Sequence, residues 1–269
     1  MSRNVRIVSR QNERIREAKK LAQKKHRDAT GRFCLEGVRL VEEALTASLV
    51  EELFFTERLL QSPRGRELVQ RAQTSAVQVY ECSEPVLEEL TDTVNSQGVA
   101  AVARKPAWEL QPQGLMLIAD EIQDPGNMGA LLRTGVGAGA RTLFVVKGSV
   151  DVYSPKVVRA SMGAIFHLPH QVVDRPEVLE LMEKRGIALV VADLENAQDF
   201  WTAAYPQDVA VVIGNEARGV HASFRDQAAL RVRIPLVGPV ESLNASVAAG
   251  VLLYEILRQY RCSRPESVL

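Results

Sequence analysis

The sequence predicts an α/β fold in two parts, a small N-terminal α/β domain and a larger C-terminal domain built on a parallel sheet. The chain has 269 residues, enough for two domains of the usual size, about 150 residues each. After position 115, short runs rich in Val and Ile alternate with helical patterns, which is typical of parallel strands covered by helices on both faces. The stretch KPAWELQPQG at 105–114 has two prolines, a glycine and no period, which indicates a linker. We therefore expect domains at 1–104 and 115–269.

The N-terminal domain combines apolar stripes at helical spacing with short apolar strands. Ile15, Ala18 and Leu21 form a thin apolar stripe on an otherwise basic helix, and Val38 and Val41 begin the stripe of the next one. We expect helices at 11–26, 36–46, 64–74 and 84–90, and strands at 52–56, 76–82 and 98–103.

The C-terminal domain contains apolar runs such as LMLIAD and DVAVVIG that end in turn residues. Continuous apolar runs of this length fit strands buried on both faces. We expect strands at 115–120, 142–146, 187–193 and 208–214. We expect helices at 127–138, 155–163, 176–185 and 244–260.

Several classes of protein are disfavoured by composition. No apolar run approaches the roughly 18 residues that a membrane span needs, and the charged N-terminus lacks the apolar segment of a signal peptide. Cys34, Cys82 and Cys262 lie far apart with no Cys/His ligand spacing, which argues against disulfides and a zinc site. His167 and His170 lack a third ligand. We expect a cytoplasmic protein with no membrane segment and no bound metal.

The net charge is zero, with 33 Lys and Arg against 33 Asp and Glu, but the charges are unevenly distributed. Residues 1–32 hold eleven Lys and Arg against three acids. A basic segment on a neutral protein is typical of polyanion binding, although charge runs more often form a solvated helix face. The shortage of acids here favours RNA or DNA. The expected contacts are Arg14, Lys19, Lys20, Lys24, Lys25 and Arg27.

The stretch DPGNMGALLRTGVGAG at 124–139 contains a glycine spacing that resembles a nucleotide-binding loop. In a dinucleotide fold, however, the glycines follow a strand and open a helix. Gly135, Gly137 and Gly139 lie at the far end of the expected helix, so the order is reversed. Gly139 is better explained as a helix C-terminal glycine, and the other two as positions of close packing.

The polar residues of the same stretch have two interpretations each. The Pro-Gly pair suits a tight turn, and Asn127 suits a helix N-cap. Arg133 has mostly small helical neighbours, including Gly129 and Ala130, which leaves room for a bulky anion beside its guanidinium. An arginine on an exposed helix flank would show the same pattern. These residues alone therefore leave their roles open.

Two further stretches decide between these interpretations. IGNEARGV at 213–220 follows an apolar strand, and IPLVGPVESLNASVAAG at 234–250 leads into the last helix. Together with DPGNMGALLRTG they resemble, in order, the three motifs of the SpoU/TrmH family of RNA ribose 2′-O-methyltransferases, in the SPOUT superfamily. SPKVVRASMGAIFHLP at 154–169 and the basic opening of the chain resemble the ribosomal RNA members and their small substrate-binding domain. The resemblance covers nearly the whole chain.

The resemblance implies a deep trefoil knot in the C-terminal sheet, a homodimer through the knotted domains, and S-adenosylmethionine as the cofactor. It implies that backbone groups hold the adenine while apolar side chains cover it. The matching cofactor positions are Gly214, Asn215, Ile234, Leu236 and Leu243. We also expect Arg159 and Arg218 to contact RNA.

The resemblance further assigns an activating role to Arg133. Because a guanidinium stays protonated in proteins, we expect it to stabilise a developing 2′-alkoxide, or to hold the adjacent phosphate so that its oxygen accepts the proton. Asn127, Glu216, Ser242 and Asn244 match motif residues that hold loops and substrate. Ser242 and Asn244 are equally suited to cap the last helix.

We therefore expect methylation of a ribose 2′-hydroxyl, in 23S ribosomal RNA. Three alternatives stay open: a non-catalytic RNA-binding scaffold or assembly factor, a transfer RNA methyltransferase, and a ribosomal RNA methyltransferase that confers antibiotic resistance. The complete polar set of the three motifs argues against a scaffold. It does not identify the modified nucleotide.

Overall fold

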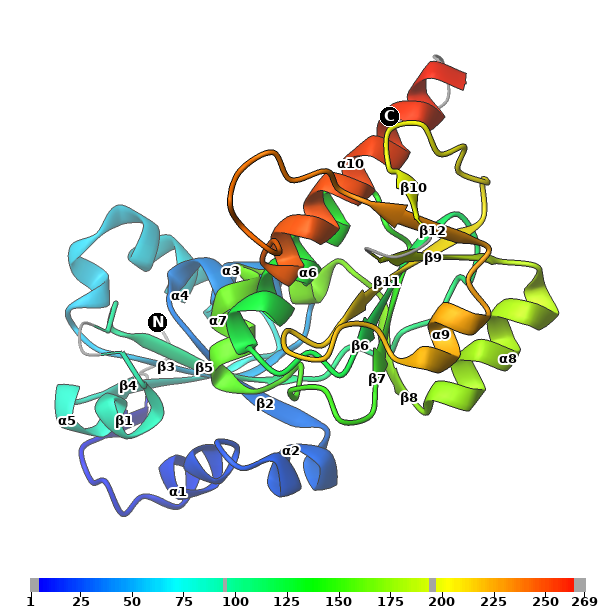
Figure 1. The fold of residues 1–269 in the computed structure, drawn as a ribbon. Coiled ribbons are helices and arrows are strands. Elements are labelled where there is room, and N and C mark those ends of the chain that lie inside the picture. The colour runs from blue at the N-terminus through cyan, green and yellow to red at the C-terminus, as the bar shows by residue number, and fades with distance from the viewer. Residues whose placement is uncertain (1–4, 94–95, 194–196, 264–269) are drawn as a thin grey trace. The chain divides into compact units, whose positions relative to one another are not determined.

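The computed structural model describes residues 5–93, 96–193 and 197–263 (Figure 1). The chain divides into two compact units. Unit 1 consists of Met1–Ala107 and Asp151–Phe166, and unit 2 of Trp108–Val150 and His167–Leu269. Segment 151–166 therefore belongs to unit 1, although it connects two strands of unit 2.

Unit 1 contains a five-stranded mixed sheet in the order β1-β4-β3-β5-β2. Its strands are β1 (Val5–Ile7), β2 (Arg32–Glu36), β3 (Val50–Phe55), β4 (Gln78–Cys82) and β5 (Val99–Arg104). Its helices are α1 (Glu13–Lys20), α2 (Lys24–Thr30), α3 (Val38–Thr46), α4 (Pro63–Thr74), α5 (Glu84–Leu87) and α7 (Pro155–Ser161). Short 3-10 turns occur at η1 (Leu59–Gln61), η2 (Glu88–Leu90) and η3 (Ala164–Phe166). Strand β5 runs antiparallel to both of its neighbours.

The single helix expected at 11–26 is instead two helices. Asn12 caps α1 by accepting a hydrogen bond from Arg14 N at 3.0 Å, and Gln23 then takes an extended conformation that ends the helical run before α2. Strand β2 was missed. Its apolar residues Phe33 and Leu35 alternate in the sequence, and in the structure both are buried while Cys34 and the residues on either side of the pair are half-buried.

Unit 2 contains a seven-stranded sheet in which every neighbouring pair is parallel, in the order β10-β12-β9-β11-β6-β7-β8. Its strands are β6 (Leu115–Asp120), β7 (Thr142–Val146), β8 (His170–Val173), β9 (Ala188–Ala192), β10 (Gln198–Asp199), β11 (Val209–Gly214) and β12 (Leu230–Arg233). The predicted parallel sheet is confirmed. The edge strands β8 and β10 and the short β12 were missed, because none is a long apolar run.

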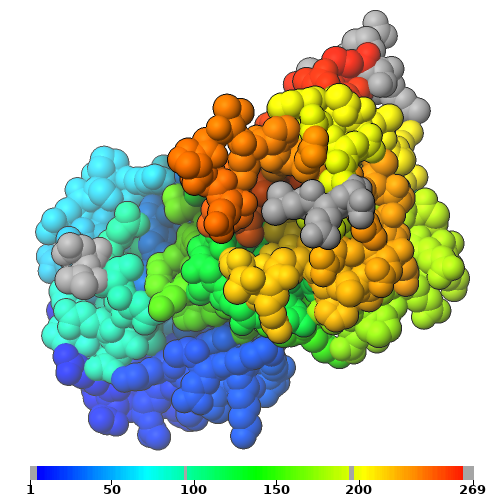
Figure 2. Space-filling view, viewed as in Figure 1, coloured from blue at the N-terminus to red at the C-terminus, as the bar shows by residue number. Residues whose placement is uncertain are grey.

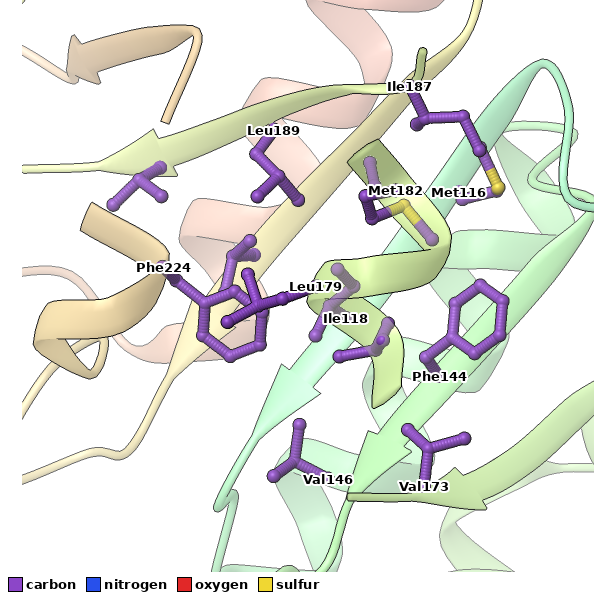
Figure 3. Packing of buried hydrophobic residues seen from close by; sticks show 14 of the residues in the cluster. Met116, Ile118, Phe144, Val146, Val173, Leu179, Met182, Ile187, Leu189 and Phe224 are labelled. Atoms are coloured by element: carbon purple, nitrogen blue, oxygen red, sulfur yellow. The ribbon is translucent and has the colours of Figure 1, made fainter. Parts of the chain in front are cut away.

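Helices cover both faces of this sheet. The helices of unit 2 are α6 (Pro125–Gly137), α8 (Arg175–Arg185), α9 (Ala222–Asp226) and α10 (Ala245–Ser263). On one face, Leu179 and Met182 of α8 and Phe224 of α9 pack with Ile118 and Phe144 of the strands (Figure 3). Helices α6 and α10 pack side by side on the other face (Figure 1).

The glycines near the end of α6 have the packing and capping roles that we predicted. A Cβ atom on Gly135 would lie 2.9 Å from Leu168 Cδ2 and 3.0 Å from Leu117 Cδ1. A Cβ atom on Gly137 would lie 2.9 Å from the hydroxyl of Tyr254 on α10. Gly139 has a φ of +75° just beyond the helix, a conformation that glycine adopts easily.

Candidate functional site

Two of the motif loops begin side by side where strands β6 and β11 end. Asp120 pairs with Gly214 in the parallel register of these strands, so the loops that follow share the carboxyl edge of the sheet. The loop after β11 turns back at once, with a hydrogen bond from Gly219 N to Asn215 O at 2.8 Å. A Cβ atom on Gly214 would lie 2.3 Å from Gly219 C and Val220 N, so the tight turn requires glycine there.

The N-cap of α6 is Asp124, not Asn127. Asp124 Oδ1 accepts a hydrogen bond from Asn127 N at 2.8 Å. Our prediction of an Asn127 cap was wrong because proline needs no amide hydrogen in the first turn, which places the helix start at Pro125. Asn127, which is 7% exposed, therefore keeps its side chain for bonds outside its own helix.

Glu216 joins the first two motifs. Its carboxylate accepts hydrogen bonds from Gln123 N at 3.1 Å, from Asp124 N at 3.1 Å and from Asn127 Nδ2 at 2.9 Å. Partial burial raises the pKa of Glu216, but the hydrogen bonds from Asn127 and the backbone amides outweigh it and hold the pKa below its ordinary value of 4.5. The group is therefore an ionised acceptor at neutral pH.

Asn244 adds the third motif to this set. Its Nδ2 donates to Asn127 Oδ1 at 2.8 Å, and its Oδ1 accepts from Ser246 N at 2.9 Å. Asn244, and not Ser242, therefore caps α10. Glu216, Asn127 and Asn244 form one continuous chain of hydrogen bonds through all three motifs.

Arg133 and Ser242 are motif residues outside this set of hydrogen bonds, because their side chains have no partner among the described residues. Arg133 is exposed on α6, six residues or about 9 Å of helix beyond Asn127. Its guanidinium makes no hydrogen bond or ion pair with the residues that the structure describes. Ser242 is also exposed, and within the same ranges its hydroxyl has no hydrogen-bond partner. Both side chains are available to a substrate.

A cleft of about 750 Å³ opens beside the turn after β11 and the segment before α10. All five expected cofactor positions, Gly214, Asn215, Ile234, Leu236 and Leu243, line it. In Figure 2 the orange segment before α10 borders this recess. The volume is typical of small-molecule sites, about 300–1,000 Å³. Apolar side chains and the backbone of a glycine turn fit the adenosine part of S-adenosylmethionine.

Asn215 lines the cleft, and its side chain stabilises the turn after β11. Its Nδ2 donates to Glu121 O at 2.9 Å, and its Oδ1 accepts from Ala217 N and Arg218 N, both at 3.0 Å. These bonds use one amide N–H and the amide oxygen, and they fix the side chain within the turn.

Most cations expected to contact RNA are bonded to acids within unit 1. The pairs are Arg14–Glu52, Lys19–Glu89, Lys20–Glu17 and Lys24–Asp28. Such exposed pairs contribute little to stability, because water and salt screen them, so a phosphate can replace the acid. Lys25 is exposed and forms no ion pair in the described part of the chain.

Arg27 is a correction to the expected RNA contacts. It is 3% exposed; Nη1 donates to Leu21 O and Ala22 O at 2.7 Å, and Nη2 to Asp151 Oδ2 at 2.5 Å. The guanidinium is therefore fully engaged in the interior of unit 1. The sequence could not show this, because Asp151 is 124 residues away.

Arg159 and Arg218 are also bonded to acids. Arg159 Nη1 lies 3.2 Å from Asp92 Oδ2 and 3.6 Å from Glu36 Oε2. Arg218 Nη2 donates to Glu121 Oε2 at 2.6 Å, and its side chain is 70% exposed. Of the two, Arg218 is the more accessible.

Sequence reasoning missed two kinds of functional group at the carboxyl edge of the unit 2 sheet. The backbone amides of Gln123 and Asp124 hold Glu216, and backbone donors leave no sequence signal. Asp120 did leave one, because a charged residue at the end of a buried strand must find partners.

No helix in the described ranges is long and apolar enough to cross a membrane. Among the same residues, no group of three or more His, Cys, Asp or Glu is placed to hold a metal ion.

Two models of known protein families together match most of the chain. A sequence model of the SpoU rRNA Methylase family matches residues 114–254. A model of the MRM3-like substrate binding domain matches residues 12–101. The first match spans more than half of the chain, and it contains all three motifs.

Individual proteins are similar over nearly the full length. The 23S rRNA (guanosine(2553)-2′-O)-methyltransferase RlmP of Bacillus subtilis is 32% identical over 251 residues, which cover 93% of this chain and 98% of that protein. A crystal structure of an RNA 2′-O ribose methyltransferase is 36% identical, with a TM-score of 0.81, and covers 95% of this chain and 99% of that chain. The SpoU methyltransferase AviRb of Streptomyces viridochromogenes, solved with AdoMet, is 31% identical, with a TM-score of 0.83, and covers 93% of this chain and 98% of that chain.

Proposed function

Because the chain belongs to the SpoU rRNA Methylase family, we propose that it methylates the 2′-hydroxyl of a ribose in ribosomal RNA, with S-adenosylmethionine as the methyl donor. The observation that carries this proposal is the bonded set Asn127–Glu216–Asn244, which joins the three motifs beside the cleft while Arg133 stays unpaired. A protein that only binds RNA gains nothing from this arrangement. A 2′-hydroxyl acceptor implies RNA, because DNA has none.

The reaction needs alignment and help for a weak nucleophile. A bond forms between the ribose 2′-oxygen and the methyl carbon, the bond from that carbon to sulfur breaks, and the hydroxyl proton must leave. When bound, S-adenosylmethionine supplies the electrophilic methyl group. A guanidinium group is not a base in proteins, so Arg133 does not take the proton. It either stabilises the developing 2′-alkoxide while the proton passes to solvent water, or holds the adjacent phosphate so that a phosphate oxygen accepts the proton.

The bonded set prepares the site before RNA arrives. Glu216 fixes the loop after β6 to the turn after β11, and Asn244 fixes both to the start of α10. Groups that are already in place do not need to reorganise during the reaction, which lowers its barrier. We assign Glu216, Asn127 and Asn244 to positioning, and Arg133 to contact with the reacting RNA.

We further propose that two copies pair through α6 and α10. Val136, Val247 and Tyr254 on these adjoining helices are 36%, 52% and 51% exposed, and grouped exposed apolar side chains mark interaction surfaces. The resemblance to the family implies a homodimer through the knotted domains. The trefoil knot likewise stays a prediction. Substituting both Val247 and Tyr254 by Glu should convert a dimer to a monomer in size-exclusion chromatography with light scattering.

Unit 1 is the proposed RNA-binding part. It carries 20 Lys and Arg against 16 Asp and Glu, whereas unit 2 carries 13 against 17. Cations of α1 and α2 are exposed in it, including Lys20, Lys24 and Lys25. Because phosphate contacts release counterions, RNA affinity should fall steeply with salt.

The test is methyl transfer from methyl-tritiated S-adenosylmethionine to unmodified ribosomal RNA, ribosomal particles and transfer RNA. We compare the wild type with Arg133→Ala and with Arg185→Ala, a control that also removes an exposed helical arginine of unit 2. We expect alkali-resistant label at a single ribose of ribosomal RNA with the wild type and the control, and none with Arg133→Ala, which should still bind the cofactor.

Other results would change the assignment. Label confined to transfer RNA would contradict the ribosomal substrate and leave the chemistry intact. A wild type that neither binds the cofactor nor labels any RNA would contradict the enzyme, and a non-catalytic RNA-binding scaffold would then be the better description.

A further inference from the structure

A second set of hydrogen bonds joins the end of β6 to the turn after β11. Asp120, the last residue of β6, is 1% exposed. Its Oδ1 accepts from Arg175 Nε at 3.2 Å and Nη2 at 2.9 Å, and its Oδ2 accepts from His221 N at 2.8 Å. His221 is two residues beyond Gly219 and caps α9. One buried carboxylate therefore connects the start of α8 to the end of the turn after β11.

Glu121, the next residue, connects Arg175 to the start of the same turn. Its φ of +58° lies in the left-handed region, which is unfavourable for a residue other than glycine and persists only when its surroundings enforce it. In this conformation its carbonyl oxygen accepts from Asn215 Nδ2 at 2.9 Å, and its carboxylate accepts from Arg175 Nη2 at 2.7 Å and from Arg218 Nη2 at 2.6 Å.

Arg175 is the group that both acids share. The hydrogen bond from Arg175 holds the pKa of Glu121 below its ordinary value of 4.5, and the same guanidinium forms an ion pair with Asp120 at 2.9 Å. The Arg175 side chain is 19% exposed, whereas Arg218, the other cation bonded to Glu121, is 70% exposed. Without Arg175, a buried carboxylate would lose its counter-charge and repel its neighbour.

We propose that Arg175 is a positioning residue for S-adenosylmethionine: through Asp120 and Glu121 it holds segment 214–221 in the conformation that forms the wall of the cleft. This inference rests on the proposed function, and it adds a residue outside the three motifs. Residues 214–220 line the cleft, while Arg175 itself does not belong to the lining. Its effect on the cofactor is therefore indirect, through the two ends of the turn.

The effect should be larger on cofactor affinity than on turnover. Glu216 is held separately, by Gln123, Asp124 and Asn127, so the set that positions the motifs keeps its own bonds when Arg175 is removed. The KM for S-adenosylmethionine should therefore rise, while kcat at saturating cofactor stays within about threefold of the wild type.

The experiment measures S-adenosylmethionine binding by isothermal titration calorimetry for Arg175→Ala and Arg175→Lys. Conformational coupling of this kind typically changes affinity by about 5–150-fold, and we expect about a tenfold rise in Kd for Arg175→Ala. Lysine keeps the charge but cannot bond both acids with a planar fork, so Arg175→Lys should be intermediate. Added guanidinium should restore binding by Arg175→Ala, and methylammonium should restore less. Arg185→Ala, at the other end of α8, is the matched control and should bind as the wild type does.

Three outcomes would overturn the proposal. Wild-type affinity in Arg175→Ala would show that the turn needs no help from this residue. A weakened affinity without guanidinium rescue, together with a lowered melting temperature, would show a general structural role. Failure of the wild type to bind S-adenosylmethionine would overturn the proposed function and this inference together, and it is distinguished from the other two by the wild-type titration alone.

Discussion

Helix α2 of unit 1 and helix α6 of unit 2 each carry an arginine, and they use it in opposite ways. Arg27 on α2 is buried and donates to two carbonyl oxygens and to Asp151. Arg133 on α6 is exposed and has no bonded partner among the described residues. An arginine whose N–H groups donate to other residues of the protein contributes to its stability. An exposed arginine without such partners is available to bind a ligand. We therefore expect substitution of Arg27 to change stability and substitution of Arg133 to change activity.

The largest effect is expected for Arg133→Ala, and on activity alone. Removal of one preorganised charge that stabilises a transition state typically lowers kcat by about 100–1,000-fold. Because nothing within the described chain depends on this side chain, the free energy of unfolding should stay within about 0.5 kcal/mol of the wild type. Single-turnover methylation and urea unfolding measure the two quantities. A loss of stability comparable to the loss of activity would place Arg133 in the fold and not in the reaction.

Arg27→Met should show the reverse pattern. It leaves the charge of Asp151 without its partner, and breaking a buried ion pair typically costs about 3–5 kcal/mol. Urea unfolding, followed in the transition of unit 1, should show this loss. The control is Lys24→Met, which removes an exposed pair with Asp28 and should cost at most about 1 kcal/mol. If Arg27→Met weakened RNA binding and left the unfolding curve unchanged, the assignment of Arg27 to the interior would be wrong.

The contrast between these arginines also shows how far the sequence could go. Both were visible as cations, and the motif around Arg133 identified its role by resemblance. The partner of Arg27 was not visible, because Asp151 belongs to a segment that lies between two strands of unit 2 in the sequence and packs in unit 1. Local patterns describe neighbours in the chain. They do not show which distant residue neutralises a charge.

At the site, the sequence predicted which residues take part better than it predicted the hydrogen bonds between them. The alternation of apolar runs and helices predicted the parallel sheet, and the motif residues of the three loops do meet at its carboxyl edge. The N-cap was misplaced by three residues, because Asp124 and Asn127 both suit that role and only the position of Pro125 decides between them. The hydrogen bonds from backbone amides to Glu216 could not be predicted, since every residue except proline carries the same donor.

Glu216 combines the two roles that Arg27 and Arg133 show separately, because it stabilises loops of the fold and belongs to the site. A change of pH tests its contribution. Its pKa in the folded protein is below 4.5 because Asn127 and backbone amides donate to it. A lowered folded-state pKa means that the ionised carboxylate stabilises the folded loops. This stabilisation is fully present above the unfolded-state pKa and is lost as the pH falls through the folded-state pKa.

Above pH 4.5 Glu216 stays ionised, so we expect its titration to cause no change in S-adenosylmethionine affinity there, and we expect the affinity to fall in more acidic solution as the carboxylate is protonated. Glu216→Gln should weaken binding at neutral pH by roughly fivefold, within the usual range for coupled sites, and should reduce the acid dependence. Calorimetric titrations across the acid range measure both. An unchanged acid limb in Glu216→Gln would assign the pH dependence to other carboxylates of the site.

The smallest expected effect compares two adjacent lysines of α2. Lys24 is bonded to Asp28, whose pKa is lowered to about 2 by hydrogen bonds from Lys105 and Lys24, whereas Lys25 is unpaired in the described ranges. If Lys25 contacts an RNA phosphate, Lys25→Ala should reduce the slope of log affinity against log salt by about 0.7–0.9. Lys24→Ala should reduce it less, because part of its charge is already offset by Asp28. Fluorescence anisotropy with a labelled ribosomal RNA fragment at several salt concentrations measures both slopes. Equal reductions would show that the Lys24 pair opens on RNA binding, so that a lysine in an exposed ion pair can still bind RNA, whereas Arg27 in its buried pair cannot.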